Sequence, residues 1–152
     1  SVAENLAFRM FDAGKDGRAV FWKDGKAIAK NAIDLIKAFS VKTTSSAAPI
    51  AALSGGNVQR AVLARELTGE VNALIVSTPC FGLDFAAVSD IRDRLIEARN
   101  KGTAILLISE DLDEILELSD RILVMSEGRI AFETPMASAD IAEIGQYMAG
   151  HG

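Results

Sequence analysis

The sequence pattern changes at residues 53–60, which read Leu53-Ser54-Gly55-Gly56-Asn57-Val58-Gln59-Arg60. A serine followed by two glycines and then by residues that favour helix predicts a turn leading into a helix over residues 55–68. In the simplest interpretation Ser54 caps this helix and satisfies amides of its first turn. The same geometry also suits an anion, because the amides lie at the positive end of the helix dipole and the glycines let a phosphate approach the backbone.

Upstream of this turn, residues 1–53 show two helical patterns and no strand pattern. In the second pattern, apolar side chains repeat at helical spacing: Ile28, Ala32, Leu35 and Phe39. Three glycines mark a flexible connection between the two patterns: Gly14, Gly17 and Gly25. We therefore expect an all-helical opening segment.

Downstream of the turn, strand and helix patterns alternate. The expected strands are residues 73–77, 103–108 and 121–126, and the expected helices are residues 86–100, 111–118 and, at the end, 140–148. Glu127-Gly128 predicts a tight turn, so that the last strand folds back on residues 129–132 as a hairpin. The alternation predicts an α/β fold in which a parallel sheet is covered by helices.

Composition narrows the class of protein. The chain has 152 residues, of which 49% are hydrophobic, enough for a compact domain with a buried core. Its 16 basic and 21 acidic side chains give a net charge of -5, the wrong sign for a protein that grips nucleic acid. Cys80 is the only cysteine, which excludes an internal disulfide and a cysteine-based zinc cluster and fits a reducing compartment. The apolar runs are far shorter than the roughly 20 residues of a membrane-spanning helix.

Three further motifs follow the turn in order. They are Ser77-Thr78-Pro79-Cys80-Phe81-Gly82-Leu83-Asp84, Leu106-Leu107-Ile108-Ser109-Glu110-Asp111, and Asp120-Arg121-Ile122-Leu123 with Glu127-Gly128-Arg129-Ile130. Together with residues 53–60 they resemble the signature motif, the Walker B strand with its D-loop, the H-loop and the closing hairpin of ABC transporter ATP-binding proteins. The signature is similar to the LSGGN form found in the second half of tandem importers of simple sugars and nucleosides. The resemblance spans essentially the whole chain.

The resemblance implies a partial P-loop NTPase fold, that of an ABC ATPase. Residues 1–53 would be part of the helical subdomain, and residues 54–152 would carry the signature helix and the Walker B, D-loop and H-loop part of the core. The implied function is that of an ATP-binding subunit of a simple sugar or nucleoside importer, lying peripherally on the cytoplasmic face of the inner membrane. The implied partners are a second ATP-binding half and the transmembrane permease subunits, with ATP and Mg²⁺ as cofactors of the full assembly.

The resemblance also implies roles for particular residues. Two halves of such an ATPase close head to tail, so that each signature faces ATP held by the other half. The residues expected to contact that ATP are Ser54, Gly55, Gly56 and Gln59, while Asp84 would help to couple the two sites across the interface.

The sequence departs from the family where magnesium is anchored and water is activated, since these places hold Ser77 and Thr78. Neither hydroxyl is charged near neutral pH, so neither replaces the metal-binding aspartate or the catalytic glutamate. Glu110 stands where the H-loop usually has histidine, and a carboxylate about 4 Å from a phosphate oxygen would be repelled by roughly 4 kcal/mol at an effective dielectric of about 20. We therefore expect no metal ligand and no intact catalytic residue here, and a hydrolytically degenerate site that is inactive in this chain alone.

A Walker A motif is missing from the sequence. The nearest candidate, Gly25-Lys26, has Val20 in place of the first glycine and Ala27 in place of the hydroxyl. By resemblance the motif should precede Ser1, and its strand should lie between residues 103–108 and 121–126. Without it we expect these two strands to pair directly, or the chain to swap strands and dimerise.

Two other classes remain open. One is an ABC-type ATPase outside transport, such as a DNA-repair or translation factor, against which the acidic balance and the lack of a long coiled-coil insertion argue. The other is a non-enzymatic α/β interaction domain in which the turn is only a helix cap. In all of these we expect Phe81, Phe85 and Trp22 to pack, and His151 to lie in a frayed tail.

Overall fold

The computed structural model describes residues 1–10 and 25–150, which form two compact units divided inside the second strand, at residues 106 and 107. The predicted connection at Gly14 and Gly17, the tryptophan at position 22 and the terminal His151 lie outside the described residues. Each unit is described by itself below.

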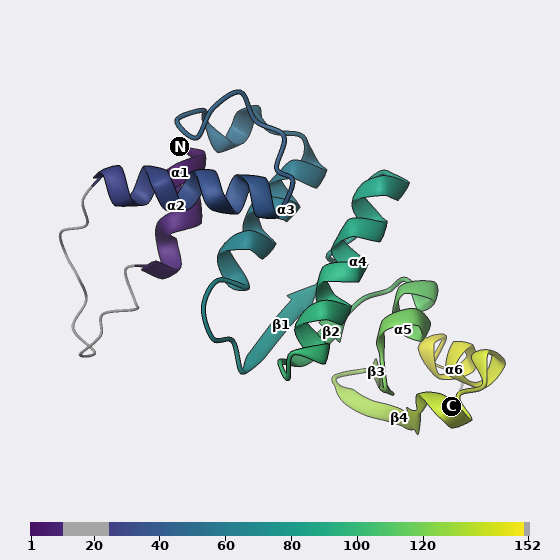
Figure 1. The fold of residues 1–152 in the computed structure, drawn as a ribbon. Helices are drawn as coiled ribbons and strands as arrows, with labels where there is room; N and C mark the ends of the chain where they lie inside the picture. Colours follow the sequence, from purple (N-terminus) through teal and green to yellow (C-terminus); the bar gives the residue numbers. More distant parts are fainter. Residues whose placement is uncertain (11–24, 151–152) are drawn as a thin grey trace. The chain divides into compact units, whose positions relative to one another are not determined.

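The first unit begins with helices that share one core (Figure 1). These elements are α1 (Val2–Ala7), η1 (Phe8–Met10), α2 (Gly25–Ala38), η2 (Ile50–Ala52) and α3 (Gly55–Glu66). Val2, Leu6, Ala32, Ala61 and Ala64 are buried together, with the predicted apolar positions Leu35 and Phe39 packed against them. The helical prediction for this segment is therefore confirmed for the described residues, and α3 belongs to the same core.

The loop before α3 completes the first turn of α1. The Val2 amide donates to the carbonyl oxygen of Ala48 at 2.9 Å, and the Ala3 amide donates to that of Ser46 at 2.8 Å. These bonds satisfy amides that have no partner inside a helix. They hold residues 46–48 against α1 and so place the chain that enters α3.

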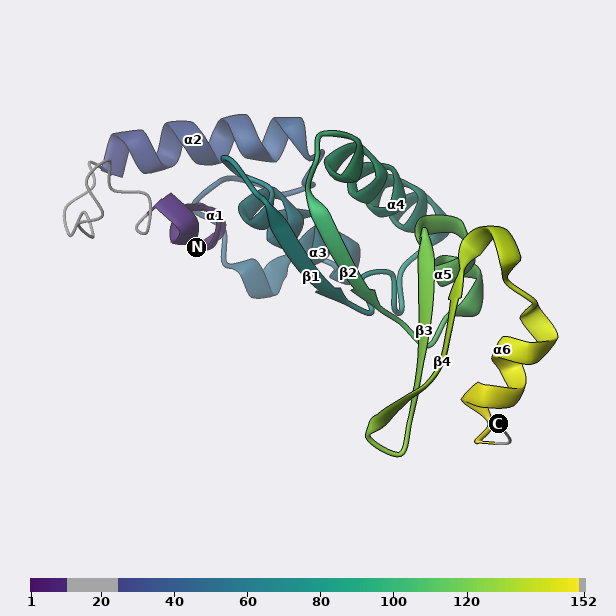
Figure 2. The same cartoon turned by 90° about the horizontal axis from the view of Figure 1, so that it is seen from below.

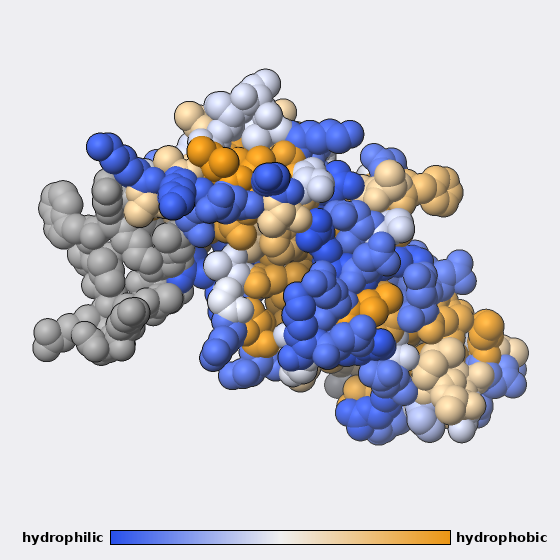
Figure 3. Space-filling view, in the orientation of Figure 1, coloured by the Kyte–Doolittle hydropathy of each residue, from blue (hydrophilic) through white to orange (hydrophobic). Residues whose placement is uncertain are grey.

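The remainder of the first unit is strand β1 (Ala73–Ser77), helix α4 (Phe85–Asn100) and strand β2 (Ala104–Ile108), of which β1 and β2 form a two-stranded sheet. Figure 2 shows the two arrows pointing the same way, with α3 behind them. Leu74 and Val76 are buried, as are Ile91 and Leu95 on α4. Hydrophilic side chains gather over the outward face of α4 (Figure 3). The predicted parallel α/β arrangement is confirmed.

The second face of the β1–β2 sheet is apolar and open within the described residues. Ala73 and Ala104 are exposed, and Ile75 and Leu106 are 72% and 51% exposed. Parallel sheets are normally covered on both faces, so this apolar face is a candidate contact surface.

The second unit is a hairpin covered by helices. It contains α5 (Leu112–Leu118), β3 (Arg121–Ser126), β4 (Arg129–Pro135), η3 (Met136–Ser138) and α6 (Ile141–Met148). Strands β3 and β4 are antiparallel, and the turn between them has φ of 50° at Glu127 and 76° at Gly128. Ile122, Val124 and Ile144 form the core. The predicted tight turn and hairpin are confirmed.

Strands β2 and β3 belong to separate two-stranded sheets. Of the two outcomes expected from the missing strand, their direct pairing is therefore wrong for the described residues. A two-residue turn brings β4 beside β3 at little entropic cost, so the hairpin forms without a ladder to β2. Among the described helices none is long and apolar enough to cross a membrane.

Candidate functional site

The turn at the start of α3 presents unused hydrogen-bond donors. Gly55 and Gly56 are the first residues of the helix, and in the described part of the chain their amides donate to no protein group. Gly55 is exposed and Gly56 is half-buried, so the amides lie close to solvent. A twelve-residue helix adds its positive dipole end at the same point.

Ser54 occupies the cap position of α3 but does not cap it. Its φ of -66° and ψ of 158° suit an N-cap, yet its side chain accepts no bond from a backbone amide of the first turn. The Ser54 Oγ instead accepts a hydrogen bond from Asn57 Nδ2 at 2.8 Å. The simple capping interpretation of Ser54 is therefore wrong for the side chain, since its oxygen accepts from the Asn57 side chain and from no backbone amide of the helix.

The D-loop segment packs directly against this turn. A Cβ placed on Gly55 would meet the Leu83 Cδ2 atom at 3.7 Å, and one placed on Gly56 would meet the Ala87 Cβ atom at 3.1 Å. The second approach is too tight for an ordinary side chain, so the glycine allows α3 to start against α4. Two motifs that are distant in the sequence are thus neighbours in the fold.

Asp84 has a local structural role. One of its carboxylate oxygens accepts a hydrogen bond from the Ala87 amide at 2.9 Å, and the residue is the N-cap of α4. Its side chain is otherwise exposed. Gln59, the last residue predicted for this site, is half-buried on α3.

The two phenylalanines beside Asp84 do not pack. Phe81 is 86% exposed and Phe85 is 97% exposed in the described chain. The expectation that both are packing residues is therefore wrong here. Leu83, between them in the sequence, takes the packing position against the glycine turn instead.

Ser77 and Thr78 lie exposed at the end of β1. Thr78 has a φ of 44°, which is rare for a β-branched residue, and its carbonyl accepts a bond from the Phe81 amide at 3.3 Å. Two neutral hydroxyls lack the negative charge that a carboxylate anchor brings to Mg²⁺. Within the described ranges no group of three His, Cys, Asp or Glu residues could hold a metal ion.

Glu110 belongs to the second unit and is exposed. It lies two residues before α5, and the carboxylate that caps this helix is that of Asp111, which accepts bonds from the Asp113 and Glu114 amides at 3.0 and 3.2 Å. Glu110 is thus beside a helix start without being its cap.

A charged network that the sequence did not reveal joins α3 to α4. Asp90 Oδ2 lies 3.0 Å from Arg60 Nε and 3.2 Å from Arg94 Nε. Burial by itself would raise the pKa of Asp90, but the hydrogen bonds and charges of Arg94 and Arg60 outweigh it, and the pKa lies below its ordinary value. Arg94 also donates to the Ala38 carbonyl at 3.1 Å and lies over the Phe39 ring, which fixes the end of α2.

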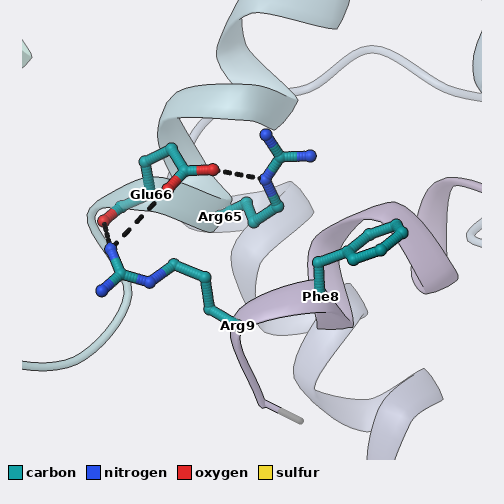
Figure 4. A pocket seen from close by; sticks show the side chains of 4 residues that line it. All are labelled: Phe8, Arg9, Arg65 and Glu66. Carbon is teal, nitrogen blue, oxygen red and sulfur yellow. Dashed lines mark hydrogen bonds and ion pairs between the residues drawn. The ribbon is translucent and has the colours of Figure 1, made fainter. Parts of the chain in front are cut away.

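A hollow of about 370 Å³ lies elsewhere, between the start of the chain and the end of α3, lined by Phe8, Arg9, Arg65 and Glu66 (Figure 4). Arg65 Nε donates to one Glu66 carboxylate oxygen at 2.6 Å, while Arg9 Nη1 donates to the Glu66 backbone carbonyl and forms an ion pair with the other carboxylate oxygen at 3.7 Å. The two arginines are thus paired, and none of the predicted site residues lines this hollow.

Solved structures define the class of the fold. The ATP-binding cassette MJ0796, in a dimeric post-hydrolysis state with ADP and Pi, superposes with a TM-score of 0.74 and 19% identity over 90% of this chain and 56% of the cassette. The cassette MJ1267 gives a TM-score of 0.70 and 20% identity over 95% of this chain and 62% of its own. The fold is therefore that of part of an ABC ATP-binding cassette.

Curated relatives place the chain within that class. The glucose import ATP-binding protein TsgD13 of Haloferax volcanii is 40% identical over 100% of this chain and 28% of its own length. The nucleoside import ATP-binding protein NupA of Lactococcus lactis is 39% identical over 99% of the chain and 29% of its own length. No protein-family model matches the sequence. The chain belongs to the family of ABC transporter ATP-binding proteins. It spans less than a third of the length of these two relatives.

Proposed function

We propose that this chain is part of an ATP-binding subunit of a simple sugar or nucleoside importer, and that its turn at residues 53–56 contacts ATP held by a second ATP-binding half. One observation carries the proposal. The amides of Gly55 and Gly56 and the hydroxyl of Ser54 donate to no protein acceptor in the described residues. Three donors at one exposed turn match the terminal phosphate of a nucleotide.

The physical basis is electrostatic. A phosphate at the start of α3 would accept charge-assisted hydrogen bonds from the glycine amides and would lie at the positive end of the helix dipole. The absence of side chains at both glycines lets its oxygens approach the backbone. Gln59 lies half-buried on the same helix and would also contact this phosphate.

The exposed aromatic residues beside Asp84 support a partner at this edge. Phe81 and Phe85 expose 86% and 97% of their surface, and two large apolar side chains at one loop offer a contact surface to another protein. Asp84 keeps one carboxylate oxygen unused within the described residues. We assign it the coupling of the two nucleotide sites across this edge.

The half to which this chain belongs would bind nucleotide but hydrolyse it poorly. Ser77 and Thr78 provide neither a metal anchor nor a general base, and Glu110 would repel a terminal phosphate. Hydrolysis would then take place at the partner's site, which this chain completes with its signature turn. The assembly would be asymmetric, with Mg²⁺ bound at the site of the partner.

Import is favoured over the two other classes by the relatives. Those for glucose, nucleoside, arabinose, guanosine and ribose import all match this chain at 37–42% identity. By analogy the parent protein would work with permease subunits, at the cytoplasmic face of the membrane.

The test is ATP turnover by the full-length protein assembled with its partner half. Gly55→Leu should lower turnover by about 100-fold, because a bulky side chain would occupy the place of the phosphate. Thr78→Ala should change turnover by less than about twofold. The Gly55 side is open, with Leu83 Cδ2 at 3.7 Å as the nearest atom, so the first variant should fold. The opposite ranking would refute the asymmetric assignment.

A further inference from the structure

The orientation of the Asn57 side chain is fixed by a backbone group. Asn57 Oδ1 lies 2.7 Å from the backbone nitrogen of Lys42, which can only donate. The oxygen of the amide must therefore face Lys42, and the NH₂ group must face Ser54. Asn57 is only 9% exposed, so water does not compete for these positions.

This orientation dictates the role of the Ser54 hydroxyl. Asn57 Nδ2 lies 2.8 Å from Ser54 Oγ and has no lone pair to offer, so Ser54 accepts in that bond. Its single hydroxyl proton must then point elsewhere. In the described residues it finds no protein acceptor, and Ser54 is exposed, so the proton points out of the turn.

Ser54 Oγ is also not used as an N-cap acceptor. In an ordinary N-cap the serine Oγ accepts from a backbone amide of the first turn, but here the backbone N–H of Asn57 donates to the Ser54 carbonyl oxygen at 2.9 Å. A donor chain runs from the Lys42 N–H through Asn57 to the Ser54 hydroxyl. Each hydrogen bond in such a chain polarises the next, which makes the terminal O–H a better donor.

We propose that Asn57 is a positioning residue that holds the Ser54 hydroxyl as a donor toward the terminal phosphate of the partner's ATP. This inference rests on the proposed function of the turn. It adds that the backbone N–H of Lys42 fixes the orientation of the Ser54 hydroxyl through the buried side-chain amide of Asn57. Asn57 itself touches no nucleotide in this scheme.

The test compares single and double variants of the full-length protein, assembled with its partner half and permease subunits, by steady-state ATP turnover. Asn57→Leu keeps the size of the side chain and removes both hydrogen bonds without adding charge. Asn57→Asp can still accept from Lys42, but its second oxygen can only accept, so the Ser54 proton turns inward. Each should lower kcat by about tenfold or more with little change in KM, because the partner half still holds the nucleotide.

The decisive readout is non-additivity with Ser54→Ala. If Asn57 acts through the Ser54 proton, the double variants Ser54→Ala/Asn57→Leu and Ser54→Ala/Asn57→Asp should turn over about as fast as Ser54→Ala alone. Thermal unfolding shows whether each variant folds. If Asn57→Leu does not fold, the comparison is made with Asn57→Asp and Ser54→Ala/Asn57→Asp. Thr43→Val, which removes the bond from Thr43 Oγ1 to the Ser45 carbonyl at 2.9 Å in the same loop, should leave turnover within about twofold.

Two results separate the failure of this inference from that of the proposed function. If Ser54→Ala lowers turnover but the Asn57 variants do not, or if their effects multiply with that of Ser54→Ala, the positioning role is wrong while the turn still contacts nucleotide. If neither Ser54→Ala nor Gly55→Leu affects turnover, the proposed function of the turn fails, and the inference fails with it.

Discussion

Gly56 and Ala87 bring the start of α3 into direct contact with the first turn of α4. A Cβ on Gly56 would stand 3.1 Å from the Ala87 Cβ, closer than ordinary carbon contacts allow. Ala87 is 1% exposed and has little room to move. The geometry of the signature turn therefore depends on the packing of the D-loop segment, and a change at either residue should disturb both.

Substitution of the two glycines should have different effects on stability. Gly56→Ala should lower the free energy of unfolding by about 1–2 kcal/mol, because the added methyl overpacks the contact with Ala87. Gly55→Ala should be neutral within about 0.5 kcal/mol, since its Cβ would meet only Leu83 at the ordinary distance of 3.7 Å. Urea unfolding of the isolated chain checks both. Equal losses for the two variants would show that helix-start conformation, and not the contact with Ala87, determines the effect.

Asp90 should make stability depend on pH. Its pKa in the folded chain is lower than its ordinary value. Its contribution is therefore fully present above the unfolded pKa of about 3.9 and is lost as the pH falls through the lowered value. Asp90→Asn should cost about 1 kcal/mol near neutral pH, and the difference from the parent chain should shrink below pH about 4.

Urea unfolding over a pH series measures this difference directly. Asp93→Asn, on the same helix but exposed, is the matched control and should cost less than about 0.5 kcal/mol at every pH. A cost for Asp90→Asn that does not change with pH would show that its carboxylate charge is not what stabilises the contact between α3 and α4.

The open apolar face of the β1–β2 sheet should make the isolated chain bind hydrophobic dyes and self-associate. Ile75→Thr with Leu106→Thr should reduce the binding of a hydrophobic dye and self-association, with little loss of stability, because these side chains are 72% and 51% exposed. Leu74→Thr is the contrasting change, since Leu74 is 8% exposed and its replacement should cost about 2 kcal/mol or more. Dye fluorescence and sedimentation measure the first effect. Unchanged dye binding in the double variant would show that the dye binds to another surface.

Phe85 should matter for assembly more than for folding. It is 97% exposed, so Phe85→Ser should change the stability of the isolated chain by less than about 0.5 kcal/mol. In the full-length protein the same change should weaken ATP-dependent closure of the two halves by about tenfold, because an apolar anchor at the interface is lost. Phe8→Ser, also exposed at 61% but in the hollow of Figure 4, should leave closure unchanged. Equal effects of the two variants would contradict a partner surface at Asp84.

Much of this fold could be predicted because its signals are local. Periodic apolar positions predicted the helices, and the Glu127-Gly128 dipeptide predicted the hairpin, since both residues adopt the positive φ that such a turn requires. The strands β1 and β3 match their predicted bounds, Ala73–Ser77 and Arg121–Ser126. Short-range conformational preference decides these features.

The rest of the site depends on long-range contacts that no local pattern encodes. The bond between Lys42 and Asn57 joins residues that are 15 apart in the chain, and Arg60 and Asp90 are 30 apart. The positive φ of Thr78 is also hidden, because a β-branched residue ordinarily avoids that conformation. The signature stretch did contain Asn57, but only the structure shows that Ser54 Oγ accepts a hydrogen bond from the Asn57 side chain and from no backbone amide of the helix.

Because Cys80 is buried, its reactivity can report on local opening of the chain around it. It is the only cysteine, it forms no disulfide, and its thiol is buried within the segment that runs from Thr78 to Asp84. A thiol reagent can reach it only when that segment opens, so the rate of labelling measures loosening of the D-loop without an engineered probe. If nucleotide carried by the other half tightens this edge, the thiol should be shielded for longer in the loaded assembly than in the empty one.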